Sequence, residues 1–318
     1  MRAAVDGRNH RDAGRRAASA LGGSSIGATR YLAGAVDPLA IGSFRFGLGV
    51  LLLAPLATLG GGRWPERRDW PGIAGLGLLF FALFPLLFNA SLIYTTAARG
   101  ALALSTLPLL TMAVGAALGV EALTWGKTIG VLIAMAGVAF ALLSGFGQAP
   151  PGAWRGDLLM VAAALCMALY GVWSRPFIRR LGPIPFTAVA MGVGAACLIA
   201  LGLARGSFAA VAAFGAAQWT AALYLGALGG ALTFFLWAFA LKHTTPTRVA
   251  ISVTVNPVVA SLVGAFLLRE PLSLNLAAGI VAVFVSIALA TRPDSDVEPK
   301  TRLRRTGKPP LAPGEINS

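Results

Sequence analysis

The sequence has few charged residues for its length. Of its 318 residues, 12% are Asp, Glu, Lys or Arg and 57% are hydrophobic, whereas soluble domains carry roughly 25% charged residues. So few charges cannot cover the surface of a soluble protein. The apolar residues instead form runs of about 20, the length with which a helix crosses a hydrocarbon core of roughly 30 Å. We therefore expect the lipid bilayer to be the solvent of this chain.

Residues that hold metals or perform acid–base catalysis are also scarce. The chain has two cysteines and two histidines, and Cys166 and Cys197 lie inside apolar runs. It has no His/Cys cluster and no paired carboxylates, and residues 145–148 lack the Lys-Ser/Thr end of a phosphate-binding loop. We expect no metal, no cofactor and no enzymatic activity. A membrane-embedded enzyme acting on lipid-linked substrates and a membrane scaffold or receptor are the alternative functions.

The net charge of +14 does not indicate nucleic-acid binding, because the basic residues lie between and outside the apolar runs. Both ends, 1–16 and 292–318, are basic and are predicted to be disordered cytoplasmic tails. With the tails inside the cell, the outer loops hold only Arg99, Arg155, Arg205 and Arg269, as the positive-inside rule requires. The expected location is the cell membrane, as a multi-pass protein of a bacterial inner membrane.

Apolar runs bounded by charges, Pro or Gly predict an all-α membrane protein of about ten transmembrane helices. The predicted helices lie near 17–36, 38–59, 71–93, 99–119, 125–145, 157–176, 184–204, 218–241, 247–268 and 273–291. An even number of helices places both termini on the same side of the membrane.

The two halves of the sequence repeat each other. An offset of 149 places Thr95-Thr96 on Thr244-Thr245, Arg99 on Arg248, Pro108 on Pro257, Glu121 on Glu270 and Gly130 on Gly279. Nearer the start of each half, an offset of 145 pairs Arg30 with Arg175, Pro38 with Pro183 and Gly47 with Gly192. Each unit holds five predicted helices, an odd number, so the second unit enters the membrane in the opposite orientation. Such inverted repeats allow one half to rock against the other about a central site, which predicts transport by alternating access.

The repeated motifs also resemble a known family. Two copies of Thr-Thr-x-x-Arg-x-Ala, each followed by a helix with a central Pro, by Glu-x-Leu and by a Gly-containing last helix, resemble the paired EamA repeats of the drug/metabolite transporter superfamily. The resemblance covers roughly 17–291, with repeats at 17–146 and 155–291. It implies a permease for a small metabolite or drug-like molecule, working by efflux. Leu21-Gly22 stands where the family often has Trp-Gly.

Two arginines inside predicted helices are candidate substrate ligands. Arg30 and Arg45 each lie seven residues from the turn at Asp37-Pro38, so both start about 10 Å from the outer end of their helices. Since no Asp or Glu is predicted within the core of any helix, the pair is expected to attract an anionic substrate group. The alternative is a structural role, with both side chains reaching outward or bonding to backbone carbonyls.

Other polar and aromatic residues are further candidates. Pro108 and Pro257 each remove a backbone donor and predict a hinge or kink at membrane depth. The polar residues that either line the cavity or satisfy and pack neighbouring helices are Asn256, Asn89, Ser24 and Ser25. The aromatic residues that either line the cavity or anchor the helices at the membrane interface are Tyr170, Trp173, Tyr224 and Trp237. Glu121 and Glu270 either gate or couple transport, or cap a helix and pair with a base such as Lys127 or Arg269. The expected partners are a small-molecule substrate and the bilayer, without nucleic acid, and the sequence leaves monomer and homodimer open.

Overall fold

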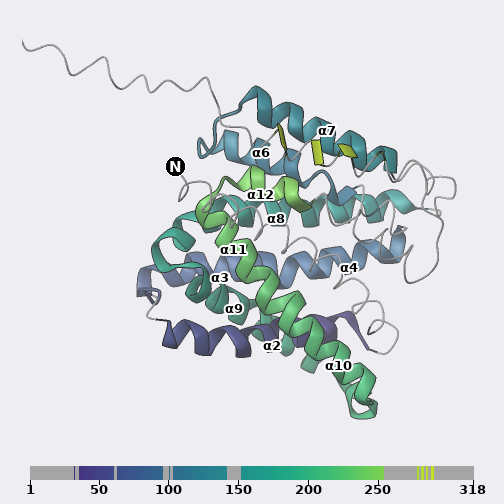
Figure 1. Cartoon of the computed structure of the whole chain (residues 1–318). Helices are drawn as coiled ribbons and strands as arrows, with labels where there is room; N and C mark the ends of the chain where they lie inside the picture. The colour runs from purple at the N-terminus through teal and green to yellow at the C-terminus, as the bar shows by residue number, and fades with distance from the viewer. Residues whose placement is uncertain are drawn as a thin grey trace, which may run out of the picture.

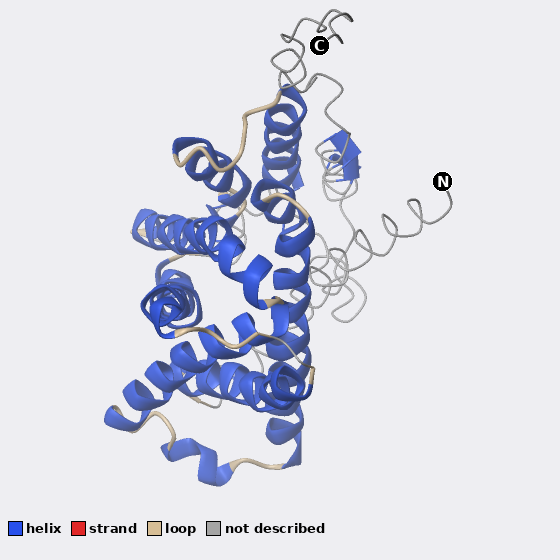
Figure 2. Cartoon of the chain, turned by 90° about the vertical axis from the view of Figure 1, so that its left-hand side faces the viewer, coloured by secondary structure: helices blue, strands red, loops and turns tan. Residues whose placement is uncertain are grey.

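The computed structural model describes residues 32, 36–60, 63–95, 100, 103–141 and 152–253, and isolated positions between 278 and 289. This part of the chain is helical and contains no strand, and Figures 1 and 2 show its helices packed side by side. In chain order its elements are α2 (Pro38–Leu59), the 3₁₀ turn η1 (Arg67–Asp69), α3 (Trp70–Gly77), η2 (Leu78–Leu83), α4 (Phe84–Tyr94), α6 (Leu107–Ala117), α7 (Trp125–Ala141), α8 (Ala153–Leu181), α9 (Pro183–Ala204), the 3₁₀ turn η4 (Ala209–Ala213), α10 (Ala216–Tyr224), η5 (Leu225–Leu232), α11 (Thr233–His243) and α12 (Pro246–Val253).

Five of these helices are long and apolar enough to cross a membrane. They are Pro38–Leu59, Arg67–Ser91, Ala153–Leu181, Pro183–Ala204 and Ala216–His243. Each coincides with one of the helices predicted from the sequence. Two shorter apolar helices, Leu107–Ala117 and Trp125–Gly137, add to them. Of the predicted helix at 17–36, only residues 32 and 36 belong to the described part of the chain.

Helices α2 and α9 are equivalent in the two halves and pack against each other along their length. Both have 22 residues, and adding 145 to the bounds of α2 gives the bounds of α9. Each begins with Pro, which fits the first turn of a helix because its missing N–H needs no partner there. At the start of α2, the Asp37 carboxylate accepts a hydrogen bond from the Leu39 N–H at 2.8 Å, as an N-cap residue does.

The next long helix of each half contains a π-helical segment that the sequence analysis missed. Residues 78–83 form the π-helix η2, and an offset of 149 places them on 227–232, inside the π-helix η5. The same offset carries Tyr94, the end of α4, onto His243, the end of α11. Isolated π-turns are rare and widen a helix locally, so finding them at matching positions extends the sequence repeat into three dimensions.

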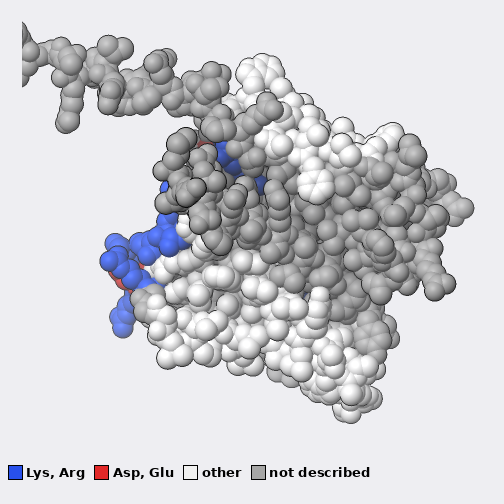
Figure 3. Space-filling model, in the orientation of Figure 1, with Lys and Arg blue, Asp and Glu red and all other residues white. Residues whose placement is uncertain are grey.

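Charged side chains concentrate at one end of the helices. In Figure 3 the visible Lys and Arg atoms gather at the left, near the turn that holds η1. There Arg180, near the end of α8, pairs with the buried Asp69. At the opposite end of the same helices, the Thr95 hydroxyl donates to the Asp157 carboxylate at 2.8 Å. Polar bonds at both ends therefore fix α8 to the helix formed by α3, η2 and α4.

Candidate substrate site

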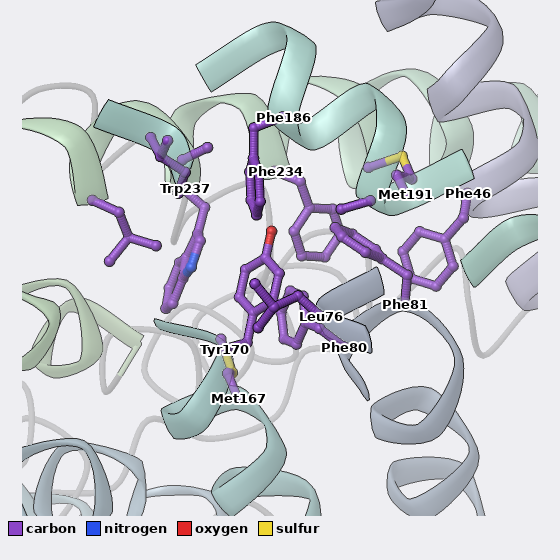
Figure 4. Close-up of a cluster of buried hydrophobic side chains, with 14 of the residues drawn as sticks. Phe46, Leu76, Phe80, Phe81, Met167, Tyr170, Phe186, Met191, Phe234 and Trp237 are labelled. Carbon is purple, nitrogen blue, oxygen red and sulfur yellow. The ribbon is translucent and has the colours of Figure 1, made fainter. Parts of the chain in front are cut away.

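Buried aromatic rings from several helices form one cluster (Figure 4). Phe80 of η2 stacks on Tyr170 of α8, with ring centroids 4.2 Å apart and planes 19° apart. Phe234 of α11 contacts Phe46, Phe80 and Phe81, with centroids 5.7, 5.5 and 5.1 Å away. Rings from both halves therefore meet at one place.

Arg45 borders this cluster and is held by the other half of the chain. Its Nε donates to the carbonyl of Gly229, in η5, at 3.0 Å. Its guanidinium carbon lies 5.6 Å from the ring centroids of both Phe46 and Phe234, within the range of cation–π attraction. In the part of the chain that the structure describes, no carboxylate pairs with Arg45. The backbone bond gives Arg45 a structural role, but it uses one of five guanidinium donors.

The absence of a side chain at Gly230 lets η5 approach the backbone of α2 at Arg45. A Cβ built on Gly230 would lie 2.3 Å from the Arg45 carbonyl oxygen, so only Gly allows this approach. The offset of 149 shows that Gly229 and Gly230 replace Phe80 and Phe81 of the first half. The offset of 145 likewise shows that Arg45 replaces Ala190. At these aligned positions one pairing holds an arginine and two glycines, and the other holds an alanine and two phenylalanines.

The aromatic candidates divide into buried and exposed groups. Tyr170 is 1% exposed and Trp237 is 7% exposed, and both belong to the central cluster. The indole N–H of Trp237 is buried without a hydrogen-bond partner among the described residues. Trp173, by contrast, is 46% exposed and does not join the cluster, while Asn89 is half-buried in α4.

Pro108 marks a break rather than the centre of a continuous helix. The sequence predicted one helix over 99–119, but α6 begins at Leu107, and residues 105–106 form a turn. Proline has no N–H to donate to an earlier carbonyl, and the Thr106 hydroxyl instead donates to the Ala103 carbonyl at 2.7 Å. A turn therefore interrupts the helix just before Pro108, the position at which the sequence predicted a hinge or kink.

Glu121 lies in a second polar group, at the end of the molecule that carries Asp69 and Arg180. After α6 ends, Gly119 adopts a positive φ of 63° and turns the chain back, so that Glu121 packs against Gly115. The Glu121 carboxylate pairs with Lys127 at 3.1 Å, and both side chains are buried. Its other oxygen accepts from the N–H and the hydroxyl of Thr247, at the start of α12.

Several candidate residues lie outside the described part of the chain. They are Ser24, Ser25, Arg30, Asn256, Pro257 and Glu270. Conversely, the sequence analysis missed Phe46, Phe80, Phe81 and Phe234, because phenylalanines in an apolar run look the same whether they face a site or lipid. The replacement of Phe80-Phe81 by Gly229-Gly230 in the aligned repeats was the signal that could have located the site.

Both halves of the sequence match the same protein family. Residues 17–143 and 154–292 each match the description "EamA-like transporter family". The chain belongs to this family. As an EamA-like protein it is a multi-pass membrane protein of a transporter family whose members act on small molecules.

Curated relatives span most of the EamA-like chain. The uncharacterized transporter YyaM of Bacillus subtilis is 24% identical over 85% of this chain and 89% of its own length. The uncharacterized protein PA1977 of Pseudomonas aeruginosa is 31% identical over 81% of this chain and 86% of its own. A probable terminal-alkyne amino-acid exporter of Streptantibioticus cattleyicolor is 26% identical over 70% of this chain and 74% of its own.

A solved crystal structure shares the EamA-like fold. It matches with a TM-score of 0.72 at 25% identity and covers 89% of this chain and 96% of the other chain. The named relatives are transporters or uncharacterized proteins, which favours transport over catalysis.

Proposed function

We propose that this EamA-like protein exports a small amphipathic metabolite across a bacterial inner membrane by alternating access. In this proposal ten helices form two inverted five-helix halves, 17–146 and 155–291, with both termini, 1–16 and 292–318, in the cytoplasm. The substrate binds at the aromatic cluster bordered by Arg45, and the break before Pro108 serves as a hinge.

The observation that carries the proposal is a pair of crossed contacts between the halves. Helix α2 of the first half packs on η5 of the second, and α9 of the second packs on η2 of the first. Both interfaces include a close backbone approach: Gly230 of η5 meets the Arg45 carbonyl, and Gly77, the last residue of α3 directly before η2, meets the Ala190 carbonyl. Two interfaces built from equivalent segments can exchange roles as one half rocks against the other.

The orientation and direction rest on two further observations. Basic residues gather at the end that the positive-inside rule assigns to the cytoplasm (Figure 3), where Arg180 binds Asp69. The relative from Streptantibioticus is named as a probable amino-acid exporter, which supports export of a small metabolite. An aromatic cluster in the interior of the protein suits a substrate with an apolar body.

The test is flux through the purified full chain in liposomes. Vesicles are loaded with a labelled mixture of amino acids and small organic acids, and release is compared with that from protein-free vesicles. Alternating access predicts saturable release that is accelerated by unlabelled solute on the opposite side. An absence of protein-dependent flux for every solute, together with turnover of a lipid-linked substrate, would contradict transport and indicate a membrane enzyme.

A further inference from the structure

We propose that the transported molecule is a monocarboxylate with a flat apolar body, held by Arg45 at its carboxylate and by Trp237 at a second hydrogen-bond acceptor. This inference rests on the proposed transport function and names the class of its substrate. It starts from two donors at the same aromatic cluster that the described protein leaves with unused hydrogen-bonding capacity.

Arg45 supplies a fixed positive charge at the boundary between the halves. Its Nε bond to Gly229 and the flanking rings of Phe46 and Phe234 hold the guanidinium plane. The two terminal nitrogens form the planar fork that binds a carboxylate through two parallel hydrogen bonds. Because the fork is already oriented by protein contacts, little side-chain entropy is lost when an anion binds.

The single positive charge of Arg45 favours a ligand that carries one negative charge. No carboxylate of the described residues pairs with Arg45, and a buried charge is costly unless it is paired. One monoanion neutralises one guanidinium. A dianion would bring an excess negative charge into an environment that is otherwise built from Phe46, Phe80, Phe81 and Phe234.

Trp237 supplies the second contact. Its indole N–H is buried and has no partner among the described residues, although buried polar groups are nearly always hydrogen-bonded. Trp237 follows Phe234 by three residues on α11, so the two side chains lie on the same face of the helix, about 4.5 Å apart along its axis. A ligand carboxylate beside Phe234 therefore places an acceptor of the same small molecule within reach of Trp237.

The asymmetry between the halves explains why there is one such site. The position equivalent to Arg45 is Ala190, and the positions equivalent to Gly229 and Gly230 are Phe80 and Phe81. The first half therefore contributes the cation, and the second half contributes the Gly229 carbonyl that accepts from it and the Phe234 ring beside it. A ligand that pairs with Arg45 of the first half and accepts from Trp237 of the second half contacts residues of both units.

The test compares carboxylates with their uncharged amides. Purified full-length protein in detergent is titrated with 4-acetylphenylacetate, whose ketone is a second acceptor, with 3-phenylpropionate and octanoate, and with the amide of each, while the thermal unfolding midpoint is measured. Binding to the folded state raises the midpoint by mass action. We expect at least one carboxylate to bind more tightly than its amide by about 10-fold to 100-fold, the range of a charged hydrogen bond.

Variants then assign the preference to the two donors. Arg45→Gln should abolish the preference for carboxylate while leaving amide binding in place, and Arg45→Lys should retain part of it through its charge. Trp237→Phe should weaken the binding of carboxylates that carry an acceptor in the apolar body, and it should leave the binding of octanoate unchanged. The matched control is Arg68→Gln, an exposed arginine paired with Glu66 at the surface, which should bind all ligands like the wild type.

The outcomes separate this inference from the transport function. Flux of other solutes through wild-type protein without any carboxylate preference would overturn the inference and leave the transport proposal intact. An Arg45→Gln protein that is less stable but keeps the wild-type ratio of carboxylate to amide affinity would show that Arg45 is structural, and would likewise overturn it. An absence of all flux would instead contradict the proposed function.

Discussion

Glu121 and Thr247 join the two halves of the chain at one end of the molecule. One oxygen of the Glu121 carboxylate accepts from the Thr247 hydroxyl at 3.0 Å and from its N–H at 3.3 Å. Thr247 stands in the first turn of α12, where backbone N–H groups are not used by the helix and favour a negative charge. Together with the ion pair to Lys127, this carboxylate fastens α12 to the turn between α6 and α7.

Replacing Glu121 by Gln should destabilise the folded protein. The side chain remains able to bond to Thr247, but buried Lys127 loses its partner charge, and breaking a buried pair costs about 3–5 kcal/mol. The measurement is the midpoint of thermal unfolding in detergent. Adding Lys127→Met to Glu121→Gln should recover part of the loss, because the unpaired charge is removed; simple additivity of the two changes would contradict the coupling.

A surface pair provides the control for that experiment. Glu66 and Arg68 also form an ion pair at 3.0 Å, but both side chains are mostly exposed. Exposed pairs contribute about 0–1 kcal/mol. Glu66→Gln should therefore leave the unfolding midpoint nearly unchanged.

Replacing Gly230 by Ala should disrupt the contact between α2 and η5. The new Cβ would lie 2.3 Å from the Arg45 backbone oxygen, and backbone cannot give way as a flexible side chain does. We expect a loss of about 3 kcal/mol or more, seen as a lower unfolding midpoint or a lower yield of folded protein.

Gly75→Ala is the matched change in an open position. No atom lies within 4 Å of a Cβ built on Gly75, and Ala in a helix interior is favoured over Gly by roughly 0.5–1 kcal/mol. This variant should be as stable as the wild type or slightly more stable. Equal effects at Gly75 and Gly230 would contradict the close packing assigned to η5.

Replacing Thr95 by Val should weaken the bond between α4 and α8. The shape of the side chain is kept, but Asp157 loses one of its donors, at 2.8 Å. Hydrogen bonds between membrane helices are worth up to about 1–2 kcal/mol, so the unfolding midpoint should fall modestly. Thr58→Val, which removes an exposed hydroxyl bonded to the nearby Pro55 carbonyl, should have a smaller effect.

Replacing Phe80 by Ala should leave a cavity at the centre of the aromatic cluster. Phe80 is 1% exposed and touches the rings of Tyr170 and Phe234, and such deletions cost of order 3 kcal/mol. Phe140→Ala, at a position 44% exposed, removes a ring from the surface and should cost much less. Similar unfolding midpoints for the two variants would show that the cluster is loosely packed.

Sequence patterns predicted helix bounds well where a long apolar run begins at a capping residue and Pro and ends at Gly. The predicted helix at 38–59 has the observed bounds because Pro38 follows the cap residue Asp37 and Gly60 closes the last turn. At 99–119 the pattern predicted a kink at Pro108, but apolar composition alone did not show that a turn at 105–106 precedes α6. Neither η2 nor η5 was predicted, since no residue pattern distinguishes a π-helix from the α-helix around it.

The sequence by itself determined that this chain is an integral membrane protein and contains two related halves. The physical reasons are local: apolar runs long enough to cross a bilayer, and motifs that recur at fixed offsets. Only the tertiary structure decided which side chains meet, because contacts such as Arg45 with Gly229 and Glu121 with Thr247 join residues more than 100 positions apart. Such pairs depend on how the two halves pack, and it is that packing that brings one arginine to a cluster of phenylalanines contributed by both.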